Sequence, residues 1–187
     1  AKDHRVTFGV RDPASPKYAD LDPAMFGVAP VDDAVKGADA IVLATPWDAT
    51  RAAIAACGPL AGRVLLDATN PLLPNLAGLD QPGGKSGGQQ VAEWAQGAKV
   101  VKVFNTTGYN NMAEPRYGDA RSMMLYCGDD AAAKQIAKRL AEDLGFDAVD
   151  FGPLANAGYS ENVAMAWIWL ALRSGMGREI GFGLMRR

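Results

Sequence analysis

The sequence predicts an α/β protein with a doubly wound, mostly parallel β-sheet and a C-terminal helix. Short apolar segments of strand length alternate with helical segments along the 187 residues, and this alternation is typical of the class. Residues 40–44 are apolar throughout, as expected of a parallel strand that is covered on both faces. Residues 131–144 carry Ile136, Leu140 and Leu144 at helical spacing, which predicts a helix that packs one face on the sheet.

The remaining elements follow from apolar runs and from the residues that end them. Gly37 closes the first helix, and Asp48 and Ser86 cap the next two, because a glycine accommodates the helix end and a short oxygen side chain accepts from free helix amides. Strands are expected at 6–10, 26–29, 40–44, 64–67, 99–104, 122–127 and 147–151. Helices are expected at 31–37, 48–57, 89–95, 131–144 and 161–174. The segment 70–88, rich in proline and glycine, is expected to be a loop.

Composition and charge are those of an ordinary globular chain. Hydrophobic residues make up 49% and charged residues 21%, and the net charge is −2, so we expect no nucleic acid and no membrane among the partners. Cys57 and Cys127 lie far apart without metal spacing, which favours two buried thiols in a reducing compartment and no metal site. The apolar run 163–172 is too short to span a bilayer, and no signal peptide is visible. A cytoplasmic location is expected.

Four predicted strands end on chemistry that suits a ligand. These ends are Arg11 and the segments 44–47, 68–71 and 105–108, which combine small residues with threonine, asparagine, proline or glycine. In open α/β sheets, ligands bind outside the carboxyl ends of the strands. Turn chemistry alone accounts for one such end more easily than for three, so the sequence favours a binding site at this edge.

The first strand, 6–10, resembles the second strand of a Rossmann dinucleotide-binding unit. Residues 1–4 resemble the tail of a helix that leads into it, so the fold's own first strand is expected to be absent. Gly9 allows close approach of a bulky neighbour, and Arg11 ends the strand. At this place an arginine accommodates the 2′-phosphate of NADP, because a guanidinium pairs bidentately with phosphate. The alternative is a surface arginine after an edge strand.

Several other residues carry weaker signals. The segment 82–88 looks like a phosphate-binding loop, but its Walker spacing fails at Leu79 and no strand precedes it, so we expect a flexible loop. His4 is the only histidine, which argues against a histidine-based nucleophile or metal site. Asp67 is expected to bond loop amides and Glu161 to interact with a helix dipole. No acid–base pair stands out, as expected of hydride transfer between two stacked rings, which needs positioning above all.

The last helix is expected to join two copies of the chain. Ala164, Ile168 and Leu172 follow helical spacing, and much of the remaining circumference is apolar as well. Such a helix cannot satisfy itself on one face of a sheet, and the leftover apolar surface is typical of an interface. Trp167 and Trp169 are expected in the core or in this dimer contact. The competing interpretation is a helix sunk in a groove of its own domain.

Taken together, these segments resemble the NADPH-dependent reductases of the deazaflavin coenzyme F-420. The resemblance spans essentially the whole chain, and its most specific parts are Asp-Ala-Thr-Asn-Pro-Leu at 67–72 and Phe-Asn-Thr at 104–106. The matching segments, in order, are 6–13, 43–47, 66–72, 103–106, 127–130 and 150–157. Members of this family begin with a strand and a Gly-rich turn that holds the pyrophosphate, and this sequence lacks that unit.

The resemblance implies an NADP(H) site in segment 1–152 and a helical segment 153–187 that contributes to the substrate cleft and the dimer. Thr69 and Asn70 would position the nicotinamide. The implied cofactor-binding residues are Gly9, Val10, Arg11, Ala44, Thr45, Pro46, Trp47, Ala68, Thr69, Asn70, Asn105 and Thr106. The implied substrate contacts are Pro71, Leu72, Leu154 and Asn156. The hydride acceptor would be the deazaflavin or, alternatively, a flavin or ferric chelate, and an NADP(H)-binding sensor without turnover is the competing function.

Overall fold

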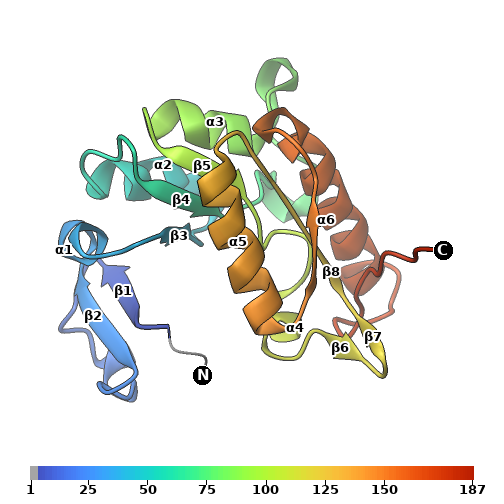
Figure 1. The fold of residues 1–187 in the computed structure, drawn as a ribbon, viewed down its shortest axis with the longest axis horizontal. Coiled ribbons are helices and arrows are strands. Elements are labelled where there is room, and N and C mark those ends of the chain that lie inside the picture. Colours follow the sequence, from blue (N-terminus) through green and yellow to red (C-terminus); the bar gives the residue numbers. More distant parts are fainter. Residues whose placement is uncertain (1–3) are drawn as a thin grey trace.

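The computed structural model describes residues 4–187 and contains a five-stranded sheet, a two-stranded sheet beside it and a short hairpin (Figure 1). Residues 1–3, part of the segment expected to be the tail of a helix, lie outside the described residues. The five-stranded sheet has the order β3 (Ile41–Leu43), β4 (Val64–Asp67), β5 (Lys99–Lys102), β8 (Met123–Gly128) and β9 (Asp147–Asp150). The two-stranded sheet pairs β1 (Val6–Val10) with β2 (Phe26–Pro30), and the hairpin pairs β6 (Arg116–Tyr117) with β7 (Ala120–Arg121).

Helices cover both faces of the larger sheet, so the predicted doubly wound α/β fold is confirmed. The helices are α1 (Val31–Lys36), α2 (Trp47–Ala56), α3 (Gly87–Trp94), α4 (Tyr109–Ala113), α5 (Ala131–Leu144) and α6 (Ala157–Leu172). Short 3-10 turns occur at Pro16–Tyr18, Pro74–Leu76, Pro82–Gly84 and Leu154–Asn156. Neighbouring residues of β4 point to opposite faces: Leu65 joins α2 and α3 in one core cluster, and Leu66 joins α5 in the other. Figure 1 shows α5 in front of the strands.

The strand directions hold one feature that the sequence did not reveal. β3, β4 and β5 run parallel, but β8 runs antiparallel to β5, and β9 runs parallel to β8. The loop–hairpin segment between β5 and β8, which contains α4, β6 and β7, returns the chain in the opposite direction. Because β3, β4 and β5 run parallel, their carboxyl ends meet at one edge of the sheet.

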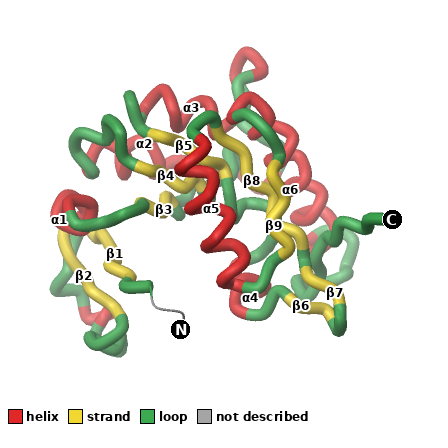
Figure 2. Tube along the Cα trace, viewed as in Figure 1, coloured by secondary structure: helices red, strands yellow, loops and turns green. Residues whose placement is uncertain are grey.

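The two sheets are separated at the place where one strand would join them (Figure 2). Among residues 4–187, β1 hydrogen-bonds to β2 alone and β3 to β4 alone. Val42 of β3 is 53% exposed, and Val6 and Phe8 of β1 are also exposed. The Rossmann order places the first strand between the strands that correspond to β1 and β3, and among residues 4–187 no strand occupies that place.

The smaller sheet is covered by α1. A side chain added at Gly9 would come within 3.2 Å of Ala34 Cβ and 3.3 Å of Val31 Cα. The close approach that Gly9 permits is therefore the approach of α1 to β1. Val35 of α1 is buried in the same core cluster as Leu43 of β3 and Ile54 of α2.

The C-terminal helix begins at Ala157, one turn before the expected position at 161. Ala157, Ala164 and Ala171 lie on its buried side, and Leu154 and Ala157 belong to the cluster that also holds Leu65. Segment 153–187 thus packs into the core of segment 1–152, and the proposed division between them stays a prediction. Trp167 lies in the core, one of the two places expected for it: it is 6% exposed, and its Nε1 donates to the Ile180 carbonyl at 2.7 Å.

Candidate functional site

The segments that follow β3, β4 and β5 lie side by side at the carboxyl edge of the sheet. Pairing continues past the strand ends, because the Ala68 amide donates to the Leu43 carbonyl at 3.0 Å and the Val103 amide to the Asp67 carbonyl at 3.0 Å. The structure therefore brings together three of the four predicted strand ends. Arg11 follows β1, which belongs to the other sheet.

Thr69 lies at this edge with its polar groups turned inward. Its hydroxyl donates to Asp67 Oδ1 at 2.7 Å, and its backbone amide donates to the same oxygen at 2.9 Å. Thr69 is buried, so its side chain shapes the loop that follows β4. The sequence expectation that Asp67 bonds loop amides is confirmed.

Asn70 and Asn105 join the ends of β4 and β5. The Asn70 amide donates to the Asn105 backbone carbonyl at 2.8 Å, and the Asn105 amide donates to Asn70 Oδ1 at 3.1 Å. The Asn105 amide also reaches Ser160 Oγ of α6 at 3.4 Å. Asn105 Oδ1 is buried and has no hydrogen-bond partner among the described residues, so this acceptor is unsatisfied in the structure.

The residue before Asn105 holds a strained backbone. Phe104 has φ 63°, a left-handed conformation that is uncommon for a bulky side chain. Its ring is buried in the cluster that contains Val101 and Met124, and this packing holds the conformation in place. Strain of this kind gathers at functional sites, and here it sets the direction of Asn105 and Thr106. Thr106 is buried, and its hydroxyl donates to Met124 Sδ at 3.6 Å.

Beneath this edge lies a cluster of three buried charged side chains. Lys102, Asp67 and Glu161 are each 0% exposed. Lys102 Nζ lies 3.0 Å from Asp67 Oδ2 and 3.2 Å from Glu161 Oε1, and it also donates to the Thr69 carbonyl. We did not identify Lys102 from the sequence. The signal that could have found it is a lysine within the apolar run Val100–Phe104, since lysine is rarely buried unless it is paired.

Glu161 interacts with a helix dipole, as expected, but the helix is α3. Its Oε2 accepts from the Gly87 amide at 3.0 Å and its Oε1 from the Gly88 amide at 2.9 Å. These amides form the N-terminus of α3, which is where a phosphate would bind in a true phosphate-binding loop. A carboxylate of the protein itself fills that place, in agreement with the rejection of the segment 82–88 as a phosphate loop.

The segment after β3 presents small side chains. Ala44 and Pro46 are exposed, and the Thr45 hydroxyl lies 3.0 Å from that of Thr50. Trp47 packs on Trp94 with ring centroids 5.2 Å apart, and its Nε1 donates to Asp80 at 3.3 Å. The indole of Trp47 is therefore a packing group, and the segment offers a ligand its backbone and its small residues.

The four predicted substrate contacts divide into two groups. The side chains of Pro71 and Leu154 are buried in the core, which leaves their backbones as the groups able to meet a substrate. Leu72 is half-buried and bridges to Leu79, and Asn156 Nδ2 donates to the Phe151 carbonyl at 2.7 Å. The substrate role of all four residues stays a prediction.

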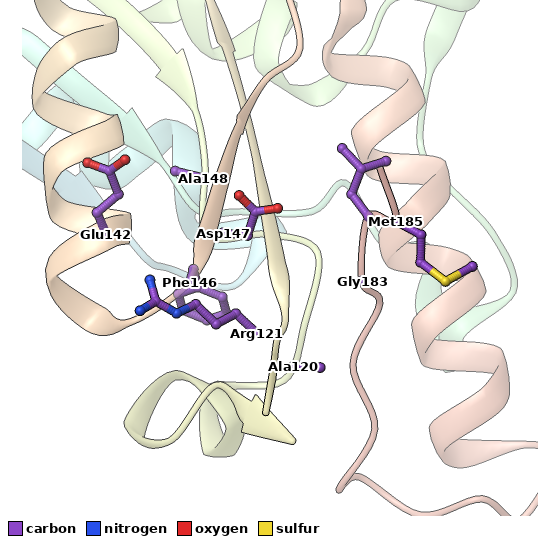
Figure 3. A pocket seen from close by; sticks show the side chains of 9 residues that line it. Ala120, Arg121, Glu142, Phe146, Asp147, Ala148, Gly183 and Met185 are labelled. Atoms are coloured by element: carbon purple, nitrogen blue, oxygen red, sulfur yellow. The ribbon is translucent and has the colours of Figure 1, made fainter. Parts of the chain in front are cut away.

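A separate hollow of about 480 Å³ opens beside the C-terminal tail (Figure 3). Arg121, Glu142, Phe146, Asp147 and Met185 are among the residues that line it. None of the predicted site residues is among them. This hollow is thus distinct from the strand-end site.

Other chemistry receives little support in the part of the chain that the structure describes. Burial raises the pKa of the Cys127 thiol to about 12 and also raises that of Cys57, so both thiols stay protonated and unreactive at neutral pH. Between residues 4 and 187, no three His, Cys, Asp or Glu side chains gather into a metal-holding group. In the same range, no helix combines the length and apolarity that crossing a membrane requires.

The residues at the strand ends fit an NADP molecule in part. Arg11 is exposed at the end of β1, where the 2′-phosphate would lie, and the small residues Ala44 and Ala68 leave room along the edge. The unpartnered Asn105 Oδ1 matches the amide donor of a nicotinamide carboxamide. For the pyrophosphate, the gap between β1 and β3 holds no Gly-rich turn among residues 4–187.

Comparison with known proteins identifies relatives along the whole chain. No protein-family model matches. The crystal structure of a protein from Arthrobacter sp. FB24, named as a candidate F420-dependent NADP reductase, is 31% identical, and the alignment covers 98% of this chain and 90% of that one with a TM-score of 0.84. A hypothetical protein, SMa0349 of Sinorhizobium meliloti, is 26% identical over 95% of this chain and 81% of that one, with a TM-score of 0.72.

A curated relative extends the comparison to a longer protein. Rat metalloreductase STEAP3 is 29% identical over 161 residues, which cover 86% of this chain and 31% of that protein. The present chain thus spans less than a third of this relative.

Proposed function

Because this chain belongs to the family of NADP reductases that includes the Arthrobacter protein, we propose that it transfers a hydride between NADP(H) and the deazaflavin coenzyme F420. The oxidoreductase class follows from the family, and the acceptor is the proposed part. The name of the Arthrobacter relative supports a deazaflavin. The name of the rat relative, a metalloreductase, supports a ferric chelate as the alternative acceptor. A flavin is the third acceptor to be tested.

The observation that carries the proposal is the arrangement of the ends of β4 and β5. Asn70 and Asn105 hold each other through two hydrogen bonds, and Asn105 Oδ1 remains without a partner. A preorganised amide pair of this kind would orient a carboxamide without adding charge beside the ring. Arg11 would bind the 2′-phosphate bidentately, and the segment that starts at Ala44 would lie along the dinucleotide.

The chemistry of the bound nicotinamide is hydride donation and acceptance at its C4 carbon. The part of the protein is to place that carbon against the acceptor and to hold it there. The strand-end side chains suit this task, because Thr69, Asn70 and Asn105 are uncharged and fixed by neighbours. A rigid bed of this kind supplies alignment, which can account for a large part of a rate acceleration.

The proposal is tested by mixing the full-length protein with NADPH and each of three acceptors: coenzyme F420, FMN and ferric citrate. Absorbance at the nicotinamide band follows NADPH oxidation. We expect turnover with F420 to exceed turnover with the other two. Tight NADPH binding without oxidation by any acceptor would instead favour the non-catalytic NADP(H)-binding module.

We also propose that the protein forms a homodimer through α6. Three large apolar side chains of this helix are exposed, Tyr159, Trp169 and Leu172, with Trp169 63% exposed. Apolar side chains of this size gathered on one face usually mark an interface, and a two-fold pairing is the default geometry for two identical chains.

A further inference from the structure

Lys102 is a fully buried charged side chain whose ammonium group contacts only protein acceptors. It stands at the end of β5, directly opposite Asp67 in the register of β4 and β5. Its ammonium group meets three acceptors: Asp67 Oδ2, Glu161 Oε1 and the Thr69 backbone carbonyl. An ammonium has three protons to donate, so this one is fully satisfied without water.

The three acceptors come from three separate parts of the fold. Asp67 ends β4, and Glu161 belongs to α6. Thr69 belongs to the loop that is predicted to position the nicotinamide. Glu161 also holds the N-terminus of α3 through Gly87 and Gly88 and accepts from Gln81 Nε2 at 2.9 Å. Lys102 is thus the point at which the sheet, two helices and the loop are joined.

The contact with the Thr69 carbonyl has a geometric consequence. The Thr69 amide and hydroxyl both donate to Asp67 Oδ1, so all three polar groups of this residue are bound to the cluster. The peptide plane between Thr69 and Asn70 contains the carbonyl that Lys102 holds. The orientation of this peptide plane sets the position of the Asn70 backbone, and therefore the position from which the Asn70 side-chain amide donates to the Asn105 carbonyl.

We propose that Lys102, held between Asp67 and Glu161, is a positioning residue for the nicotinamide: it fixes the 69–71 loop through the Thr69 carbonyl. The inference rests on the proposed hydride transfer. Stability alone is a weak reason for this cluster, because burying ions is costly and well-packed apolar side chains often serve as well. A fixed carbonyl direction is something that apolar side chains cannot supply.

The test removes one positive and one negative charge together, in the double variant Lys102→Met/Glu161→Gln of the full-length protein. This pair leaves the net charge of the cluster unchanged, although Asp67 loses its cation and keeps only the Thr69 amide and hydroxyl as donors. Phe146→Leu is the matched control, because Phe146 is 1% exposed, directly precedes β9 and is not among the residues that contact Lys102, Asp67 or Glu161. Should the double variant fail to fold, Lys102→Arg takes its place, because a guanidinium keeps the positive charge between Asp67 and Glu161 but cannot reproduce the position of the ammonium on the Thr69 carbonyl.

Three quantities are measured: hydrogen exchange of the backbone amides of Thr69, Asn70 and Leu72, NADPH affinity by calorimetry, and single-turnover oxidation of NADPH by coenzyme F420. We expect faster exchange in this loop and a fall in the oxidation rate of about 10²-fold, the typical effect of a displacement near 1 Å. NADPH affinity should change by less than about threefold, because the phosphate contacts are untouched. Phe146→Leu should lower the melting temperature and leave the oxidation rate unchanged.

Two results would overturn the inference. One is unchanged exchange at 69–72 in the double variant, which would show that Lys102 does not hold the loop. The other is a rate that falls no further than in Phe146→Leu, which would leave the cluster a purely structural role. A wild-type protein that binds NADPH but oxidises none with F420 would refute the proposed acceptor, and the exchange result would still show whether Lys102 fixes the loop.

Discussion

Asn70 and Asn105 are joined by two hydrogen bonds across the carboxyl ends of β4 and β5. The Asn70 side-chain amide donates to the Asn105 backbone carbonyl at 2.8 Å, and the Asn105 side-chain amide donates to Asn70 Oδ1 at 3.1 Å. The two residues are 35 positions apart in sequence. Their contact depends on the parallel pairing of β4 with β5 and on the left-handed backbone of Phe104. The pair turns two loops into one rigid surface, and the predictions about hydride transfer follow from it.

The variant Asn70→Leu should reduce the rate of hydride transfer more than NADPH binding. The leucine removes both hydrogen bonds to Asn105 and leaves the Asn105 amide buried without its partner, which displaces the bed of the nicotinamide while the phosphate contacts persist. We expect a loss of about tenfold to a hundredfold in kcat. Stopped-flow oxidation of NADPH and calorimetry check the two quantities separately.

Gln135→Leu is the control for that experiment, because Gln135 is an exposed amide on α5. It should leave both quantities at their wild-type values. Wild-type kcat in Asn70→Leu would contradict the proposed placement of the nicotinamide.

Arg11→Ala should abolish the preference for NADP over NAD. Arg11 is exposed at the end of β1, and no ion pair within residues 4–187 involves it. Loss of a charge-assisted contact with the 2′-phosphate should cost about 1.5–3 kcal/mol, roughly ten- to a hundredfold in NADPH affinity. NADH affinity should stay the same, and titration with both cofactors measures the difference. Equal NADPH affinity in wild type and variant would disprove the assignment.

Trp169→Glu should shift the dimer toward monomer. A charge in the centre of an apolar interface leaves it unpaired, and replacing a large aromatic side chain there typically costs at least about 2 kcal/mol. Light scattering over a concentration series gives the dissociation constant. Leu144→Glu places the same charge at another exposed apolar residue and should leave the constant unchanged. A wild-type protein that is monomeric at high micromolar concentration would remove the basis for this prediction.

The stability of the protein should fall as the pH rises above about 9. Burial raises the pKa of the Cys127 thiol from 9.0 to about 12, so the thiol ionises in the unfolded chain before it does so in the folded one. The unfolded chain then binds fewer protons, and the free energy of unfolding decreases with pH by up to about 1.4 kcal/mol per unit for this group. Cys127→Ala should lessen the slope in urea titrations between about pH 9 and pH 11. Equal slopes in the two proteins would contradict the burial of this thiol as the cause.

The sequence was sufficient to predict seven of the strands and the edge of the sheet that carries the candidate site, whereas the short strands β6 and β7 and the helix α4 were not predicted. The apolar runs around Ile41 and Leu65 are buried strands because parallel strands are covered on both faces. The gap between β1 and β3 also followed from the strand pattern. These features depend on local composition and on general rules of chain topology.

Other features depend on contacts between distant residues, and the sequence alone could not supply them. Lys102 resembles any strand lysine until Asp67 and Glu161, which lie 35 and 59 positions away, are seen to surround it. Thr69 was expected to position the nicotinamide, and the structure adds that its hydroxyl donates to Asp67. Trp167 and Trp169 are two residues apart on one helix, and only the position of the tail at Ile180 decides that Trp167 is the buried one.

The most direct test of hydride transfer uses NADPH that carries deuterium at both positions of the nicotinamide C4 carbon. The full-length protein is mixed with this cofactor and coenzyme F420, and mass spectrometry follows the label in the deazaflavin during a single turnover. We predict transfer of one deuterium to the deazaflavin without exchange with solvent, at a rate that Asn70→Leu lowers. Oxidation of NADPH with the deuterium lost to water, or a deazaflavin that remains unlabelled while NADPH stays bound, would contradict the account.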